Sequence, residues 1–125
     1  MTALRVFVAD EHTTVRNFVV RLIECWGMTV VGVAADRDEA LACADSRRAD
    51  VIVFDFDTRR GDGLTAVRRI KKALPDVPLV VHSLCDDRQY RAAVYESGAD
   101  GFVSKAGPSI DLERVLQAVT SVGPV

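Results

Sequence analysis

Short runs of apolar, mostly β-branched residues recur along the chain. Between them, apolar residues repeat every three or four positions, as on one face of a helix. The short runs are mostly continuous rather than alternating, which is typical of strands covered on both faces of a sheet. They predict five strands, at Leu4–Ala9, Thr29–Ala34, Val51–Phe54, Leu79–His82 and Gly101–Val103.

The intervening stretches predict five helices, and their ends carry start and stop signals. We expect the helices at Thr14–Trp26, from Asp36 to about Arg47, at Gly63–Ala73, at Asp86–Ser97 and after Ser109. Gly27 stands where a glycine ends a helix in the left-handed conformation. Asp36 with Glu39 is a capping-box pattern. Asp86 and Ser109 are expected to cap the last two helices.

Strict alternation of strands and helices predicts the fold. Short connections between them require right-handed crossovers and a parallel sheet with helices on both faces. Five such units in 125 residues suit an α/β, flavodoxin-like sheet of order 2-1-3-4-5, and the length suits one domain over residues 1–125. In this fold, ligands bind at the carboxyl ends of the strands, beside the switch point between the first and third strands.

Composition narrows the classes of function. The chain is 49% hydrophobic and 27% charged, with a net charge of −2 that argues against binding nucleic acid or membrane by itself. It has no apolar run of the ~20 residues that span a membrane and no signal peptide, so we expect it in the cytoplasm. Three cysteines without CxxC spacing predict reduced thiols. The charged run 68–72 is expected to face solvent.

Ionisable and hydroxyl residues follow four of the five predicted strands. Asp10 and Glu11 follow the first strand, Asp55 the third, Ser83 the fourth, and Lys105 comes after the fifth. A single carboxylate in such a place is usually a helix cap or a loop residue. Three carboxylates at one rim repel one another and need a compensating cation. Oxygen ligands favour Mg²⁺, and the pattern places no histidine or cysteine where it would favour zinc.

This rim can support phosphoryl transfer to a carboxylate. An aspartate beside Mg²⁺ is an oxygen nucleophile that forms an acyl phosphate. The transfer needs compensation of negative charge on the phosphoryl oxygens. The metal would neutralise one side, Lys105 would pair with a second oxygen, and the Ser83 hydroxyl would donate to a third.

The two histidines have no evident place in this chemistry. His12 is expected at the start of a helix, where the pattern supplies no catalytic partner. His82 falls inside a predicted strand and is expected to be packed rather than reactive. Neither residue is therefore a candidate for the site.

Four segments resemble response-regulator receiver domains, and the resemblance covers nearly the whole chain. They are Val6–His12, Asp50–Asp55 with the following 61–63, Pro78–Ser83, and Gly98–Lys105. Each motif is weakly specific alone, but the four stand in the right order at the right strand ends. The segments 9–12 and 105–107 resemble the LuxR-like class in particular, whose output is a C-terminal helix-turn-helix.

The resemblance implies a phosphoacceptor module rather than an enzyme. Asp55 would take a phosphoryl group from a sensor histidine kinase. Mg²⁺ would be held by Asp10, Glu11, Asp55 and the backbone carbonyl of Asp57. Ser83 would close on the phosphate while Phe102 rotates inward, which changes the surface of the fourth helix, fifth strand and fifth helix. The chain would reach DNA only through an output domain that it does not itself contain. A second copy of the chain is a further candidate partner, in a homodimer.

Departures from the family pattern and a second motif leave two alternatives. Glu11 stands where the family usually has aspartate, Thr58-Arg59 replaces Met-Pro, and Leu84 replaces a small residue. A pseudo-receiver that acts through protein interaction without phosphorylation is the first alternative. The second, more remote one rests on Val51–Thr58, which fits the strand and DxDxT motif of haloacid-dehalogenase-like phosphatases. There Asp57 would be the general acid beside the Asp55 nucleophile. That reading leaves the acidic pair after the first strand unexplained.

Overall fold

The computed structural model describes residues 3–43, 48–55 and 62–121. Five strands form one parallel sheet in the order β2-β1-β3-β4-β5, which confirms the flavodoxin-like topology. The strands are β1 Arg5–Asp10, β2 Thr29–Ala34, β3 Val51–Asp55, β4 Leu79–Ser83 and β5 Gly101–Ser104. The helices are α1 Thr13–Cys25, α2 Arg37–Cys43, α3 Asp62–Ala73, α4 Arg88–Glu96 and α5 Ile110–Thr120.

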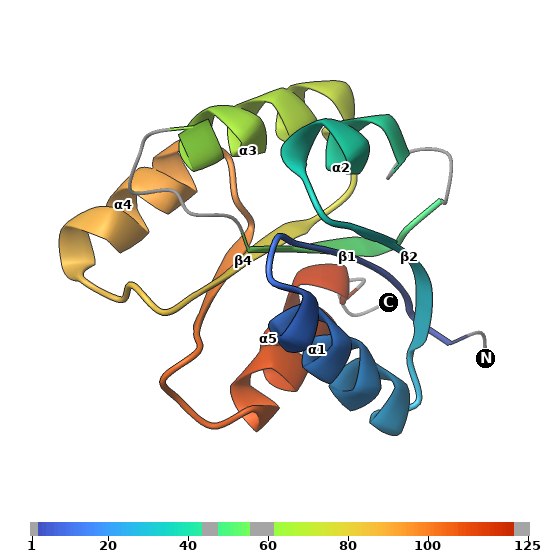
Figure 1. Cartoon of the computed structure of the whole chain (residues 1–125). Helices are drawn as coiled ribbons and strands as arrows, with labels where there is room; N and C mark the ends of the chain where they lie inside the picture. The colour runs from blue at the N-terminus through green and yellow to red at the C-terminus, as the bar shows by residue number, and fades with distance from the viewer. Residues whose placement is uncertain (1–2, 44–47, 56–61, 122–125) are drawn as a thin grey trace.

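Helices cover both faces of the sheet, with α2 and α3 above it and α1 and α5 below it in Figure 1. Side chains that alternate along each strand enter two separate cores. Phe7, Ile52 and Phe54 pack with residues of α2, α3 and α4. Val6 and Val8 pack with residues of α1 and α5. Each such side chain is fully buried and contributes about 1.5–3 kcal/mol, so the two cores hold the strand ends at one rim.

Four strands run one residue further than the apolar pattern predicts. They end at Asp10, Asp55, Ser83 and Ser104. The reason is that parallel ladder pairing continues after the side chains turn polar: Asp10 pairs with Asp55, and Ser83 pairs with Ser104. The polar side chains at the rim are therefore held by the sheet rather than by loops.

One of the expected caps is wrong, and a second stands at the predicted position without its side-chain hydrogen bond. Asp87, not Asp86, caps α4: its extended backbone (φ −80°, ψ 159°) lets its carboxylate accept the N–H of Tyr90 at 2.7 Å. Ser109 precedes α5, but its hydroxyl makes no capping hydrogen bond within the part of the chain that the structure describes. Its backbone is already helical (φ −60°, ψ −27°), whereas a capping side chain normally needs an extended one.

The other helix signals are confirmed. Asp36 accepts the N–H of Glu39 at 2.8 Å, as a capping box requires. Gly27 (φ +81°) ends α1, and its N–H donates to the carbonyl of Glu24 at 3.0 Å. The predicted end of the second helix, near Arg47, lies outside the described residues. Among the helices that are described, none is both long and apolar enough to cross a membrane.

Candidate functional site

The carboxyl ends of β1 and β3 bring two carboxylates and one ammonium together. Asp10 is 2% exposed, and Asp55 beside it is 14% exposed. Lys105 follows β5 and reaches across the rim, with its Nζ 3.5 Å from Oδ2 of Asp10 and in an ion pair with Oδ2 of Asp55. Neighbouring carboxylates of low exposure need such a cation, because water cannot screen their repulsion. The predicted convergence of Asp10, Asp55 and Lys105 is confirmed.

Two opposed effects act on Lys105. Burial lowers the pKa of its ammonium from the ordinary value, while the charge of Asp10 and a hydrogen bond to it raise that pKa. Because burial is the larger effect, the net shift is downward. The charge of Asp10 thus offsets part of the cost of burying the ammonium.

His12 also lies at this site, although the sequence pattern supplied it with no partner there. Its backbone N–H donates to Oδ1 of Asp10 at 2.8 Å, and its imidazole Nδ1 lies 3.5 Å from the same oxygen. One ligand atom each from Asp10, His12 and Asp55 lie within 4.8 Å of one another. The short turn between β1 and α1 returns the side chain of residue 12 to the strand end, which periodicity alone does not reveal. The spacing Asp-x-His at residues 10–12 is the sequence signal for this proximity.

The other two predicted metal ligands are not placed in this group. Glu11 is exposed, and the ligand group found among the described residues does not include it. Asp57 lies outside the described residues, together with Thr58 and Arg59. Their roles remain predictions.

Ser83 lies at the end of β4, close to the backbone of Lys105. Its hydroxyl oxygen accepts the N–H of Cys85 at 3.1 Å, and its carbonyl accepts the N–H of Lys105 at 2.8 Å. These bonds fix the strand end while leaving the hydroxyl hydrogen free for donation, since the oxygen is used as an acceptor. Leu84, next along the chain, is 75% exposed.

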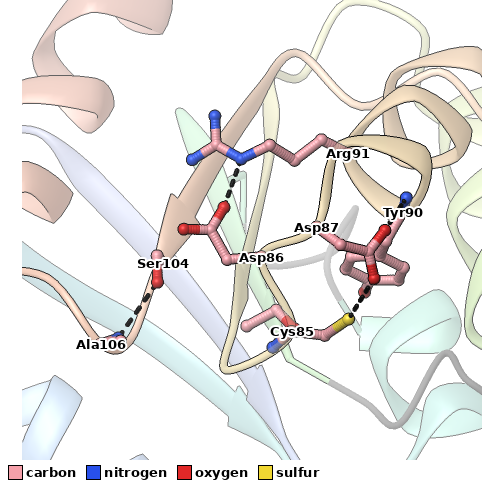
Figure 2. Close-up of polar contacts among 8 residues, drawn as sticks. Cys85, Asp86, Asp87, Tyr90, Arg91, Ser104 and Ala106 are labelled. Atoms are coloured by element: carbon pink, nitrogen blue, oxygen red, sulfur yellow. Dashed lines mark hydrogen bonds and ion pairs between the residues drawn. The ribbon is translucent and has the colours of Figure 1, made fainter.

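Phe102 on β5 is 6% exposed and packs in the core formed with α3 and α4. Its ring meets that of Tyr90 edge-on, with centroids 5.8 Å apart and planes at 75°. The guanidinium of Arg91 lies over the same ring, and Figure 2 shows Arg91 reaching from α4 to an ion pair with Asp86. The predicted switch aromatic is thus held inward by two residues of α4.

A family model described as the response regulator receiver domain matches residues 6–120. The chain is a response regulator receiver domain. Proteins of this family are regulatory phosphoacceptors, and the family resemblance predicted from the strand-end motifs is confirmed. The assignment covers both strands that carry the carboxylates and the segment that carries Lys105.

Curated relatives of this receiver domain are bacterial regulators. It is 29% identical to the response regulator GacA of Pseudomonas aeruginosa over 120 residues. This alignment covers 95% of this chain and 55% of GacA. It is 33% identical to the oxygen regulatory protein NreC of Staphylococcus epidermidis over 121 residues. That alignment covers 95% of this chain and 54% of NreC. The chain thus spans about half the length of these relatives.

Solved structures place the same fold in LuxR-type regulators. A LuxR-family two-component response regulator from Aurantimonas superposes with a TM-score of 0.87 at 27% identity, covering 95% of this chain and 86% of that one. The isolated receiver domain of RcsB from Salmonella enterica, solved with the phosphomimetic BeF3⁻, has a TM-score of 0.83 at 25% identity, covering 94% and 88%. The resemblance to the LuxR-like class is confirmed.

Proposed function

We propose that this receiver domain accepts a phosphoryl group on Asp55 from a sensor histidine kinase and thereby controls an output. The observation that carries the proposal is the position of Lys105, whose ammonium contacts the carboxylates of both Asp10 and Asp55. A transferring phosphoryl group carries negative charge on its equatorial oxygens. A cation already held beside the nucleophile compensates that charge without reorganisation.

Receiver domains bind Mg²⁺ at an acidic pocket, and the residues of this chain fit that ion. Carboxylate oxygens from adjacent strands are the hard ligands that Mg²⁺ prefers. The proposed ligands are Asp10, Glu11, Asp55 and the backbone carbonyl of Asp57. When bound, the ion would neutralise part of the negative charge on the phosphoryl group, and Lys105 would neutralise another part.

In the proposed step, an Asp55 oxygen attacks phosphorus in line with the nitrogen of the kinase phosphohistidine. A phosphorus–oxygen bond forms while the phosphorus–nitrogen bond breaks, and the electron pair of that bond stays on the imidazole. Lys105 pairs with one phosphoryl oxygen. Ser83 donates its hydroxyl hydrogen to another, since its oxygen already serves Cys85 as an acceptor.

The proposed output passes through Ser83 and Phe102 to the surface of α4, β5 and α5. Closure of Ser83 on the phosphate favours the inward ring of Phe102, so the two side chains bias one two-state surface. Residues 1–125 would be the receiver module of a longer regulator, because GacA and NreC are about twice as long as the matched segment. The longer regulator would control transcription through a DNA-binding output domain. It would act in the cytoplasm and form a homodimer.

Intact-protein mass spectrometry tests the phosphoacceptor. The protein is treated with acetyl phosphate and Mg²⁺, beside an Asp55→Asn variant and a matched Asp76→Asn control, whose carboxylate is exposed after α3. We expect one phosphoryl adduct that needs Mg²⁺, persists in Asp76→Asn and is absent from Asp55→Asn. An adduct retained by Asp55→Asn would place the phosphoacceptor elsewhere.

A pseudo-receiver is the second candidate, favoured by Glu11, which is exposed and stands outside the ligand group found among the described residues. A folded protein that forms no adduct and binds no beryllofluoride would support it. Sustained release of inorganic phosphate over many turnovers would instead support the phosphatase alternative. Membership of the receiver family gives that alternative no support.

A further inference from the structure

We propose that the imidazole of His12 is a metal ligand at this site and makes the domain favour transition cations over Mg²⁺. The inference rests on the proposed function only in that it uses the same acidic pocket. It concerns which cation the pocket prefers, and that preference can be measured without phosphorylation.

The geometry of three side chains supports a mixed nitrogen and oxygen site. Ligand atoms of Asp10, His12 and Asp55 lie within 4.8 Å of one another, and His12 Nδ1 lies 3.5 Å from Oδ1 of Asp10. Two ligands that each lie about 2.1 Å from a small divalent ion are separated by roughly 3–3.5 Å. The His12–Asp10 pair already has that spacing, and the Asp55 ligand atom lies within 4.8 Å of both.

The backbone holds His12 where it can bind. Its N–H donates to Oδ1 of Asp10 at 2.8 Å, and Arg16 donates to the carbonyl of Asp10 at 2.9 Å. These bonds tie the start of α1 to the end of β1. The imidazole is 65% exposed, so it approaches the two less exposed carboxylates from the solvent side and can turn toward an ion without repacking.

The chemical consequence is a change in metal preference. Mg²⁺ is a hard ion that prefers oxygen ligands and gains little from an imidazole. Transition cations such as Co²⁺ and Ni²⁺ bind imidazole well and exceed earlier divalent ions in affinity for sites with nitrogen ligands. The ammonium of Lys105 competes with any cation for Asp10 and Asp55. That competition applies to every divalent ion. The change in the ratio of Co²⁺ affinity to Mg²⁺ affinity between wild type and a His12 variant therefore isolates the part due to His12.

Isothermal titration calorimetry of the whole chain with Co²⁺ and with Mg²⁺ tests the inference at neutral pH. The proteins are wild type, His12→Ala, His12→Asp and a Thr13→Ala control at the neighbouring exposed position. We expect the ratio of Co²⁺ affinity to Mg²⁺ affinity to fall about tenfold in His12→Ala and in His12→Asp, and to hold in Thr13→Ala. Cysteine thiols are common to all four proteins, so their binding does not alter the comparison.

Loss of fold is a minor concern for these variants. His12 occupies the N-cap position of α1, yet its side chain makes no capping hydrogen bond in the described ranges 3–43, 48–55 and 62–121, and circular dichroism verifies folding. An unchanged ratio in both His12 variants would overturn the inference. If Mg²⁺ and a beryllofluoride adduct still bind in that case, the proposed function survives. If wild type binds neither Mg²⁺ nor Co²⁺, both proposals fail.

Discussion

The guanidinium carbon of Arg91 on α4 lies 4.7 Å from the centre of the Phe102 ring on β5. A cation over an aromatic face at this distance is attracted by the ring quadrupole. The ion pair between Arg91 and Asp86 holds the guanidinium in place, and Tyr90 meets the ring edge-on. The residue proposed as the switch is therefore held inward by contacts with Tyr90 and Arg91 of α4.

Replacing Arg91 with glutamine should loosen Phe102. At a partly exposed site, a cation–π contact contributes about 0.5–1 kcal/mol, so the inward population relative to the outward one should fall roughly two- to fivefold. Fluorine NMR of protein labelled with fluorophenylalanine, with the Phe102 signal assigned by Phe102→Leu, measures the change. Arg88→Gln on the same helix is the matched control. A Phe102 signal identical in Arg91→Gln and wild type would show that Arg91 does not restrain the ring.

Lys105→Met should separate cation binding from phosphoryl transfer. Without the ammonium, Asp10 and Asp55 repel each other and no longer share a competitor for Mg²⁺, so Mg²⁺ should bind more tightly and raise the melting temperature more than in wild type. The acetyl phosphate reaction should nevertheless slow by on the order of 100-fold, because a charge that stabilises the transition state is lost. Calorimetry and the adduct time course measure the two effects. Lys72→Met, on the exposed part of α3, is the control, and parallel losses of both properties would contradict this account.

The fold could be predicted because one local pattern determines it. Alternation of short apolar runs with helical repeats leaves few topologies for a chain of this length. The strand ends were placed one residue short because apolar character stops at Asp10, Asp55 and Ser83, whereas ladder pairing does not. Hydrophobic periodicity indicates which side chains are buried. It does not indicate whether the backbone of a polar residue continues the strand pairing.

The site was predictable as far as sheet topology decides it. Parallel strand ends meet at one rim, so Asp10, Asp55 and Lys105 had to converge. His12 was missed because its direction depends on the turn after β1. Lys71 was missed for a similar reason: it was assigned to the solvent face of its helix, but the end of α3 turns it toward the next strand. The directions of side chains at turns follow local backbone geometry, which hydrophobic periodicity does not report.

Lys71→Met should destabilise the connection between α3 and β4. Its Nζ donates to the carbonyls of Pro75 and Val77 and to Oδ2 of Asp100, which also accepts the N–H of Leu79. Loss of charged hydrogen bonds that are half-buried should lower the free energy of unfolding by about 1–3 kcal/mol. Urea denaturation measures the change, with Lys72→Met as the matched control. Equal stabilities of the two variants would show that Lys71 acts only as a surface charge.

His82→Leu should remove a pH dependence of stability. Burial lowers the pKa of His82 to about 4, and the charge of Asp10 opposes that shift. Between about pH 4 and 6.5 the unfolded chain binds this proton while the folded chain does not. Stability therefore falls by ~1.4 kcal/mol per pH unit as pH drops through that window.

Leucine binds no proton, and it also replaces a buried Nδ1 that has no hydrogen-bond partner among the described residues. The variant should gain stability over wild type by about 1–3 kcal/mol near pH 5. Urea denaturation at several pH values measures this gain. The difference between the two proteins isolates His82, because every other titrating group is common to both. A difference that stays constant from neutral pH to pH 5 would mean that His82 carries the same number of protons in both states, contrary to its burial.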